Sequence, residues 1–382
     1  MGDWIMKYMG SKRAMLQNGL GELLDREVEI NGMSRFVDLF AGSGAVAIHV
    51  AKQFPIHVLA FDLQKYSAVI AGAVIEREQQ FDWEEVWLKW EKRALARYSK
   101  IRLPKDKTLT RAVVTDYRKW SGNQDDLRIT KAYGGYYYSP QQAGLIDALL
   151  DSLPERGHTR KAALAALIKA ASRCAAAPGH TAQPFQPTRS AKPFLRDAWN
   201  RDIVQITKTI FISLAGQFAR QRGEAKVLDA NIAAKKLGEG DIAFIDPPYS
   251  GVHYSRFYHV LETIARCKDV EVSGEGRYPA PEFRPRSKYS VMTEAPAALS
   301  DLFCTIASRG AKAIITFPHD KCSNGLSGYK VRSIAEKYFL VERASVSSRL
   351  STLGGRGDNK NRESGRAARR HTRELMLVLK PK

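Results

Sequence analysis

The chain has 382 residues, of which 44% are hydrophobic, and its formal charge at pH 7 is +20. This length allows a full core plus an inserted subdomain, and the charge favours a polyanionic partner, with a merely soluble or ribosome-associated basic protein as the alternative. No apolar run of about 18 residues is present, so no membrane span is expected. The spacing of the cysteines argues against a zinc ribbon or a disulfide framework and fits a reducing cytoplasm: Cys174, Cys267, Cys304 and Cys322.

The first 80 residues alternate between helical and strand patterns. A helix is predicted at 11–25, a strand at 35–40, a helix from the glycine turn to about 54, a strand at 58–61 and a helix at 67–80. This order is typical of a βαβ unit with a parallel sheet.

The pattern changes between residues 81 and 221. Apolar residues recur at helical spacing, and strand signals are weak. An alanine-rich helix is predicted at 159–177, ending before Pro178-Gly179. The segment 81–221 is therefore interpreted as a mostly helical insertion.

Strand patterns return after the insertion, at 226–228, 242–245, 313–317 and 375–379. Between the last two, residues 343–373 are rich in Arg, Gly, Ser and Asn and carry almost no large apolar side chain. This composition predicts a mobile basic loop.

The turn Gly42-Ser43-Gly44-Ala45-Val46-Ala47 follows the strand at 35–40 with the spacing G-x-G-x-x-A. Glycine lets a ligand approach the backbone at a helix amino terminus. Asp62 lies twenty residues beyond Gly42, where a ribose-binding carboxylate belongs. The turn predicts an adenosine-type cofactor without saying which, and a purely structural glycine turn is the alternative.

The tetrapeptide Asp246-Pro247-Pro248-Tyr249 follows the apolar strand 242–245. Two prolines cannot continue a sheet, so the chain leaves as a rigid loop at the carboxyl end of the strand, where open α/β sheets place their ligands. The loop offers a carboxylate, carbonyl oxygens and an aromatic ring. These groups suit a planar heterocycle with an exocyclic amine, which needs two acceptors and a face for stacking.

Three motifs in this order resemble the alpha group of amino-group DNA methyltransferases, specifically its adenine-N6 enzymes. Lys7-Tyr8-Met9-Gly10-Ser11-Lys12 is similar to the amino-terminal cofactor motif, Asp38–Gly44 to the S-adenosylmethionine motif and Asp246–Tyr249 to the catalytic loop. The resemblance implies an α/β fold, with a Rossmann-like class I methyltransferase sheet and a mostly helical inserted target-recognition subdomain. Residues 1–80 and 222–382 would form the catalytic domain, and 81–221 the insertion.

The same resemblance implies roles for individual residues. Asp246 and the Pro247 carbonyl would accept the two hydrogens of the target amine, Pro248 would keep the loop rigid, and Tyr249 would stack on the base. The amine would attack the sulfonium methyl group in line, without a covalent enzyme intermediate. The residues expected to bind S-adenosylmethionine are Tyr8, Gly10, Lys12, Asp38, Phe40, Gly42, Gly44, Asp62 and Asp229.

A base inside a duplex cannot reach such a site, so the target must be flipped out. The residues expected to contact DNA are Tyr254, Arg256, Arg356, Lys360, Arg362, Arg366, Arg369 and Arg370. For Tyr254 and Arg256 the alternative is packing on the sheet, and for the basic loop it is a solvated segment. Phe257 is expected to pack in the core, His253 and His259 lack neighbouring metal ligands, and the aromatic stretch 133–138 either contacts bases or packs the insertion.

The expected function is site-specific adenine-N6 methylation of DNA in the cytoplasm, in a restriction–modification, phage-defence or mobile-element context. Cytosine-N4 or RNA base methylation is one alternative. Cytosine enzymes more often carry Ser at the first loop position, and small ribosomal RNA enzymes usually lack the amino-terminal motif and so long an insertion. A DNA-binding subunit of a defence complex, dependent on a protein partner, is the other.

Overall fold

The computed structural model of the protein describes residues 12–29, 34–351 and 369–382. The chain divides into two compact units. Among the described residues, the sheet unit takes those of 12–63, 219–254 and 286–382, and the helical unit takes Gln64–Phe218 and Ser255–Pro285.

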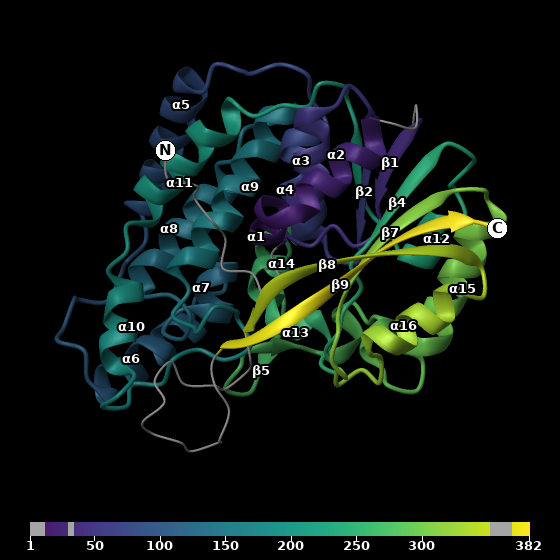
Figure 1. Cartoon of the computed structure of the whole chain (residues 1–382). Helices are drawn as coiled ribbons and strands as arrows, with labels where there is room; N and C mark the ends of the chain where they lie inside the picture. Colours follow the sequence, from purple (N-terminus) through teal and green to yellow (C-terminus); the bar gives the residue numbers. More distant parts are fainter. Residues whose placement is uncertain (1–11, 30–33, 352–368) are drawn as a thin grey trace. The chain divides into compact units, whose positions relative to one another are not determined.

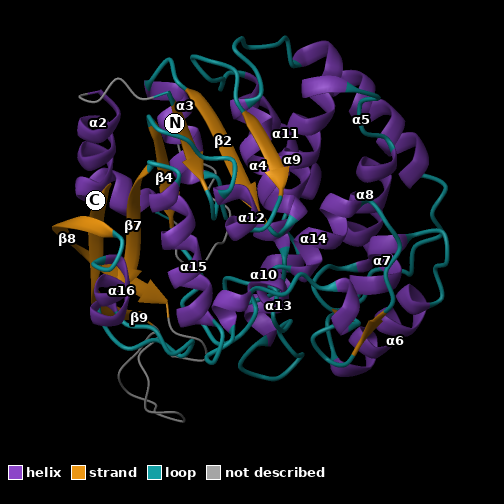
Figure 2. Ribbon diagram, turned by 90° about the vertical axis from the view of Figure 1, so that its right-hand side faces the viewer, coloured by secondary structure: helices purple, strands orange, loops and turns teal. Residues whose placement is uncertain are grey.

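The described residues of the sheet unit form one seven-stranded sheet in the order β3-β2-β1-β4-β7-β9-β8 (Figure 1 and Figure 2). β9 is antiparallel to both of its neighbours, and the other pairs are parallel. The strands are β1 (Arg35–Asp38), β2 (His57–Asp62), β3 (Glu224–Val227), β4 (Asp241–Ile245), β7 (Lys312–Pro318), β8 (Phe339–Ser351) and β9 (Arg369–Pro381). The predicted Rossmann-like α/β fold is confirmed.

Helices cover both faces of this sheet (Figure 1). On one face the alternate strand residues Val37, Ile245 and Ile315 share a core with α12 (Ala230–Ala234), α15 (Ala295–Ser308) and α16 (Gly328–Ala335). On the other lie α2 (Gly21–Glu29) and α3 (Ala45–Gln53). Because both faces are buried, β4 is apolar at four successive positions, which is why it was recognisable from sequence. Short helical turns complete the unit: α1 (Arg13–Met15), η1 (Leu16–Leu20) and η3 (Lys288–Ser290).

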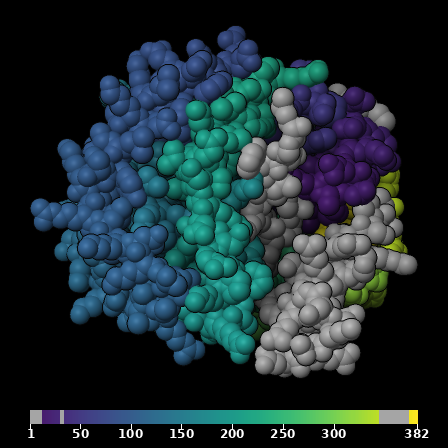
Figure 3. Space-filling view, turned by 90° about the vertical axis from the view of Figure 1, so that its left-hand side faces the viewer, coloured from purple at the N-terminus to yellow at the C-terminus, as the bar shows by residue number. Residues whose placement is uncertain are grey.

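The helical unit is organised around α9 (Gly157–Cys174), whose alanines are almost all buried. Trp87 and Trp90 of α5 pack against Phe211 of α11. The surface shown in Figure 3 is formed largely by the first helices of this unit (blue) and by the segment around α10 and α11 (teal). Its helices are α4 (Lys65–Ile75), α5 (Glu84–Tyr98), α6 (Arg111–Gly122), α7 (Arg128–Tyr133), α8 (Pro140–Asp151), α9, α10 (Lys192–Trp199), α11 (Ile203–Ala215) and α14 (His259–Arg266), with the short turn η2 (Pro281–Phe283) and the hairpin β5 (Val272–Ser273) and β6 (Tyr278–Pro279). The boundary between the units falls inside α13 (Tyr254–Phe257).

The unit boundaries differ from the sequence-based domains. The compact helical unit includes 64–80 and 255–285 as well as most of 81–221. Residues 67–80 were grouped with the sheet because a helix after a strand is typical of a βαβ unit, whereas Glu76 of α4 forms an ion pair with Lys161 of α9.

Two further predictions need correction. The helix expected at 11–25 is interrupted, because Asn18 and Gly19 have non-helical backbone angles. The basic loop expected at 343–373 is wrong at both of its ends, since 343–351 belong to β8 and 369–373 to β9, in antiparallel register from Arg343↔Leu377 to Ser351↔Arg369. Residues 352–368 lie outside the described part of the chain.

Among the residues that the structure describes, no helix combines the length and the hydrophobicity needed to cross a membrane.

Candidate active site

The glycine turn sits at the carboxyl end of β1, as predicted. Gly42 and Gly44 have φ values of 51° and 73°, a left-handed conformation that glycine adopts without strain. Gly44 precedes α3 and has no side chain that could cap this helix, and the Asp38 carboxylate accepts a hydrogen bond from the Ala47 N–H in its first turn. A helix amino terminus at such a turn favours a ligand with negative or partial negative charge.

Two carboxylates hold this turn. Oδ2 of Asp62 accepts a hydrogen bond from the Gly42 N–H at 2.9 Å, and Oδ1 of Asp38 accepts one from the Phe40 N–H at 3.2 Å. Burial raises the pKa of Asp38 to about 8, although the hydrogen bond from Phe40 opposes this. Asp38 is thus a buried carboxyl that holds the turn by hydrogen bonds, whereas Asp62 is only partly buried.

The Asp246–Tyr249 loop follows β4 and is fastened by the segment after β7. Nδ2 of the buried Asn324 donates to the Pro248 carbonyl at 2.8 Å and to the Tyr289 carbonyl at 3.0 Å. Oγ of Ser323 accepts a hydrogen bond from the Gly251 N–H at 2.9 Å. Hydrogen bonds with Asn324 and Ser323 therefore hold the loop, in addition to the conformational restriction that its two prolines impose.

Asp246 is bound on one side by Lys12 and Thr316. The Lys12 Nζ lies 3.0 Å from Oδ1 of Asp246, and the Thr316 hydroxyl donates to the same oxygen at 3.0 Å. Among the described residues, Lys12 and Thr316 thus bind Oδ1 of Asp246, and no donor to its Oδ2 is found there.

Lys12 also binds a second carboxylate, since its Nζ lies 3.1 Å from Oε2 of Glu374. The side chains of Lys12 and Glu374 are 6% and 2% exposed, and that of Asp246 is 19% exposed. Burial alone would lower the pKa of Lys12, but Asp246 and Glu374 together raise it, so Lys12 is charged. Burial raises the pKa of Asp246 to about 6, against the opposing effect of Lys12.

This arrangement gives Lys12 a contact that the sequence did not indicate. It was expected to bind the cofactor, and in the structure its ammonium binds two carboxylates, one of them in the Asp246–Tyr249 loop. Glu374, Thr316 and Asn324 were missed altogether. Only the apolar pattern around a buried Glu in the last strand could have drawn attention to Glu374.

The other expected cofactor residues are spread around the sheet unit. Phe40 meets the Tyr289 ring edge-on, with centroids 5.0 Å apart. Asp229 caps α12 by accepting hydrogen bonds from the N–H groups of Asn231 and Ile232, so it has a structural role whether or not it reaches a ligand. Tyr8 and Gly10 lie outside the described residues.

The residues expected to contact DNA lie in different environments, and some of them are outside the described part of the chain. Tyr254 packs edge-on against Tyr249, with ring centroids 6.3 Å apart. Arg256 is exposed and lies over the Tyr278 ring at 4.8 Å. Arg356, Lys360, Arg362 and Arg366 lie outside the described residues, and Arg369 and Arg370 begin β9, where the backbone alone is described.

The aromatic stretch at 133–138 mostly packs the helical unit. Tyr133, Tyr137 and Tyr138 are completely buried. Tyr136 is partly exposed, and its ring lies between the guanidinium groups of Arg118 and Arg277, 4.2 and 4.8 Å from its centroid. Packing therefore explains three of these tyrosines, and Tyr136 remains a candidate for contact with a ligand.

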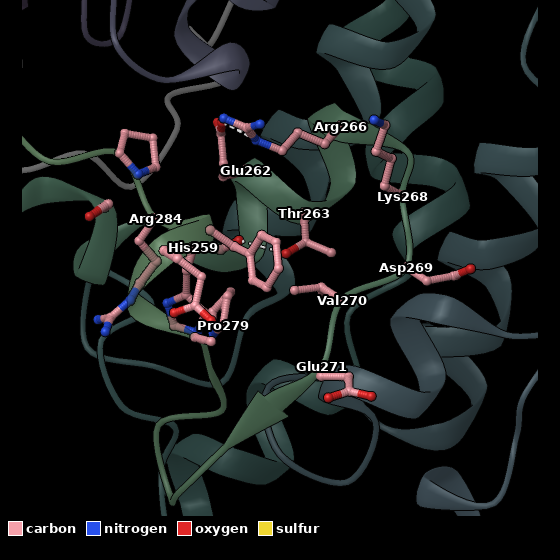
Figure 4. Close-up of a pocket in the computed structure, with 15 residues that line it drawn as sticks. His259, Glu262, Thr263, Arg266, Lys268, Asp269, Val270, Glu271, Pro279 and Arg284 are labelled. Atoms are coloured by element: carbon pink, nitrogen blue, oxygen red, sulfur yellow. Dashed lines mark hydrogen bonds and ion pairs between the residues drawn. The ribbon is translucent and has the colours of Figure 1, made fainter.

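Phe257 is buried, as predicted. His259 is buried as well, among the rings of Tyr133, Tyr137 and Tyr278. Burial lowers the pKa of His259 to about 4, so its ring is neutral. It borders a cavity of about 730 Å³ in the helical unit, which Glu262, Arg266 and Arg284 also line (Figure 4). The mixed charges of this lining do not favour an anion.

The sheet order, the glycine turn and the carboxylate-bearing proline loop at adjacent strand ends together define a methyltransferase-like α/β protein. The chain belongs to the family of D12 class N6 adenine-specific DNA methyltransferases, which it matches over residues 8–280. It is also 26% identical over 317 residues to Modification methylase LlaI of Lactococcus lactis subsp. lactis, covering 78% of this chain and 44% of that relative. The chain thus spans less than half the length of this relative.

Proposed function

We propose that this protein transfers a methyl group from S-adenosylmethionine to the N6 amine of a flipped-out adenine in DNA. The observation that carries the proposal is the arrangement around Asp246: Lys12 and Thr316 bind its Oδ1, no donor to Oδ2 is found in the described part of the chain, and we assign Oδ2 to the substrate. The family supports adenine in DNA over the cytosine and RNA alternatives.

The amine nitrogen of adenine is a weak nucleophile because its lone pair is conjugated into the ring. Oδ2 of Asp246 and the carbonyl of Pro247 would accept its two hydrogens, which draws electron density back onto the nitrogen. Asn324 binds the next carbonyl, that of Pro248, and so leaves the Pro247 carbonyl for the substrate. With a pKa of about 6, Asp246 is mostly ionised at neutral pH and is a strong acceptor.

The glycine turn suits the proposed cofactor. Gly42 and Gly44 allow close approach of a ligand at the amino terminus of α3, and the partly buried Asp62 stands at the end of β2 for the ribose hydroxyls. S-adenosylmethionine supplies a methyl group on a sulfonium sulfur, which leaves as a neutral thioether when the nitrogen–carbon bond forms. The methylated nitrogen would then lose a proton, which the Asp246 carboxylate could accept.

We assign target recognition to the helical unit. Nine Lys and Arg residues against two Asp and Glu fall between residues 89 and 111, and most of these cations are exposed. Such an excess favours phosphate contact. The Tyr136 ring has the guanidinium groups of Arg118 and Arg277 over it. Together they provide planar surfaces and positive charge in the helical unit.

We further propose a cytoplasmic role in a restriction–modification system that includes a partner protein. The relative from Lactococcus lactis is named a modification methylase. In the described chain none of the four cysteines forms a disulfide, as expected for a reducing compartment.

The test is methyl transfer from radiolabelled S-adenosylmethionine to genomic DNA and to total RNA, followed by nucleoside chromatography. Label in N6-methyladenine from DNA is expected, and it should be lost in D246A while DNA binding survives. Label only in cytosine or RNA would overturn the proposed substrate, and turnover by D246A would overturn the proposed mechanism.

A further inference from the structure

Glu374 lies in the last strand and is one of the most completely buried charged residues of the sheet unit. Its carboxylate binds Lys12, which is 362 residues away in the sequence. It also lies beyond residue 280, where the match to the methyltransferase family ends. Neither the motifs nor that match assigns it a role.

The register of β9 explains how Glu374 reaches the site. Leu375, Leu377 and Leu379 point into the core shared with α15 and α16. Side chains alternate along a strand, so Glu374 lies on the opposite face, paired with Pro318 at the end of β7. Thr316, which donates to Asp246, lies two residues earlier on the same strand and face as Pro318.

An unpaired buried carboxylate is costly, by several kcal/mol as an order of magnitude. A hydrophobic residue would fill this position in β9 without that cost. Among the described side chains, the one ammonium of Lys12 pairs with two carboxylates, Asp246 and Glu374, so the cluster carries more negative charge there than this ion pairing needs. The negative charge of Glu374 acts on Asp246, because both carboxylates bind the same Lys12 ammonium.

We propose that Glu374 is a positioning residue for methyl transfer: it anchors the Lys12 ammonium against Oδ1 of Asp246, keeps Oδ2 turned toward the target amine, and maintains Asp246 as a strong hydrogen-bond acceptor. This inference rests on the proposed function. Glu374 itself does not touch the substrate.

The charges around Asp246 predict opposite effects for its two charged neighbours. Lys12 favours the ionised form of Asp246, and Glu374 disfavours it. The other groups facing this cluster are the carboxyl of Asp38, the phenol of Tyr249 and the thiol of Cys322. These three groups are present in both variants, and Lys12 and Glu374 act on Asp246 with opposite signs, so the two substitutions should displace the titration of Asp246 in opposite directions.

The experiment is the pH profile of kcat for methyl transfer to DNA by the full chain and by two variants, E374Q and K12M. The acid limb should move to lower pH in E374Q and to higher pH in K12M, each by about half a pH unit or more. The control is E342Q, because Glu342 pairs with Lys380 across the same sheet but is exposed. Its acid limb should match that of the wild type.

If E374Q folds and its acid limb coincides with the wild type, the proposal is wrong and Glu374 serves stability alone. If E374Q does not fold, E374D keeps the charge and should retain the wild-type acid limb with a reduced kcat; an unchanged kcat would overturn the positioning role. An independent readout is the carboxyl ¹³C resonance that D246N removes from Asp-labelled protein, whose titration should shift in the same two directions. That measurement needs no turnover, so a wild-type protein without methyl transfer would count against the proposed function and leave this inference testable.

Discussion

Replacement of Asn324 by Ala should damage catalysis more than stability alone explains. Its side-chain amide donates to the carbonyls of Pro248 and Tyr289, at 2.8 and 3.0 Å, and is completely buried. Leaving a buried carbonyl unsatisfied costs about 1–3 kcal/mol. Pro248 is only half-buried, so the cost at its carbonyl should lie at the low end of this range. The free energy of unfolding should therefore drop by about 2–4 kcal/mol for the two carbonyls together.

The catalytic loss has a separate cause. Asn324 tethers the loop one residue after the proposed Pro247 acceptor, and a displacement of about 1 Å in such a group can cost about 100-fold in rate. We therefore expect N324A to lower kcat by about that factor, with a smaller effect on DNA affinity. The assays are urea unfolding and steady-state methyl transfer at a temperature where the variant remains folded.

A matched control exists in the helical unit. Gln142 is a buried amide that donates to two carbonyls, those of Ala198 and Arg201, both at 2.9 Å. Q142A should lose comparable stability and keep its kcat when folded. Equal loss of kcat in Q142A and N324A, or an unaffected kcat in N324A, would refute the argument that Asn324 acts through the loop.

Two further predictions concern charge. Replacing the exposed Arg97, Lys100 and Arg102 together by Ala should weaken DNA binding, and the slope of log K against log salt should become shallower by about 0.9 for each DNA phosphate that these side chains neutralise in the wild type; an unchanged slope would place DNA elsewhere. Because the pKa of Asp38 is raised to about 8 in the folded protein, the folded state binds more protons than the unfolded state between about pH 4 and pH 8. Stability without ligand should therefore fall as pH rises through this window, and D38N should flatten that dependence in urea unfolding; an identical pH dependence in D38N would contradict the raised pKa.

The elements that sequence predicted correctly are those with local causes. β4 is fully buried and apolar at four successive positions, β1 has a buried apolar centre at Phe36 and Val37, the glycine turn needs positive φ values, and two prolines force the loop after β4. Each signal lies within a few residues, so no knowledge of distant partners is needed. The Rossmann-like sheet follows from them in chain order.

What sequence missed depends on residues that are distant in the chain. β8 is absent from the prediction because its outer half is polar and basic, which is typical of a loop, and it becomes a strand by pairing with β9. Lys12 was placed by its motif, but its partners Asp246 and Glu374 come from the end of β4 and from β9. No local pattern encodes a contact that only the sheet order creates.

Among the described residues, those whose side chains hold the catalytic loop all lie in one unit, so substitutions that impair methyl transfer can be distinguished from substitutions that weaken DNA binding. Lys12, Thr316, Asn324 and Glu374 all belong to the sheet unit, and in the described chain they provide the side-chain contacts that hold Asp246 and Pro248. Substitutions of Lys12 or Glu374 change the charge around one carboxylate, and so appear in kcat and in the acid limb of its pH profile, whereas substitution of Asn324 displaces the loop and appears in kcat. Substitutions in the basic run at 89–111 leave those contacts intact and should appear in DNA affinity and its salt dependence, with the acid limb in place. Chemistry and DNA affinity are therefore separable by measurement, because the sequence assigns the acceptor groups and the excess positive charge to different units.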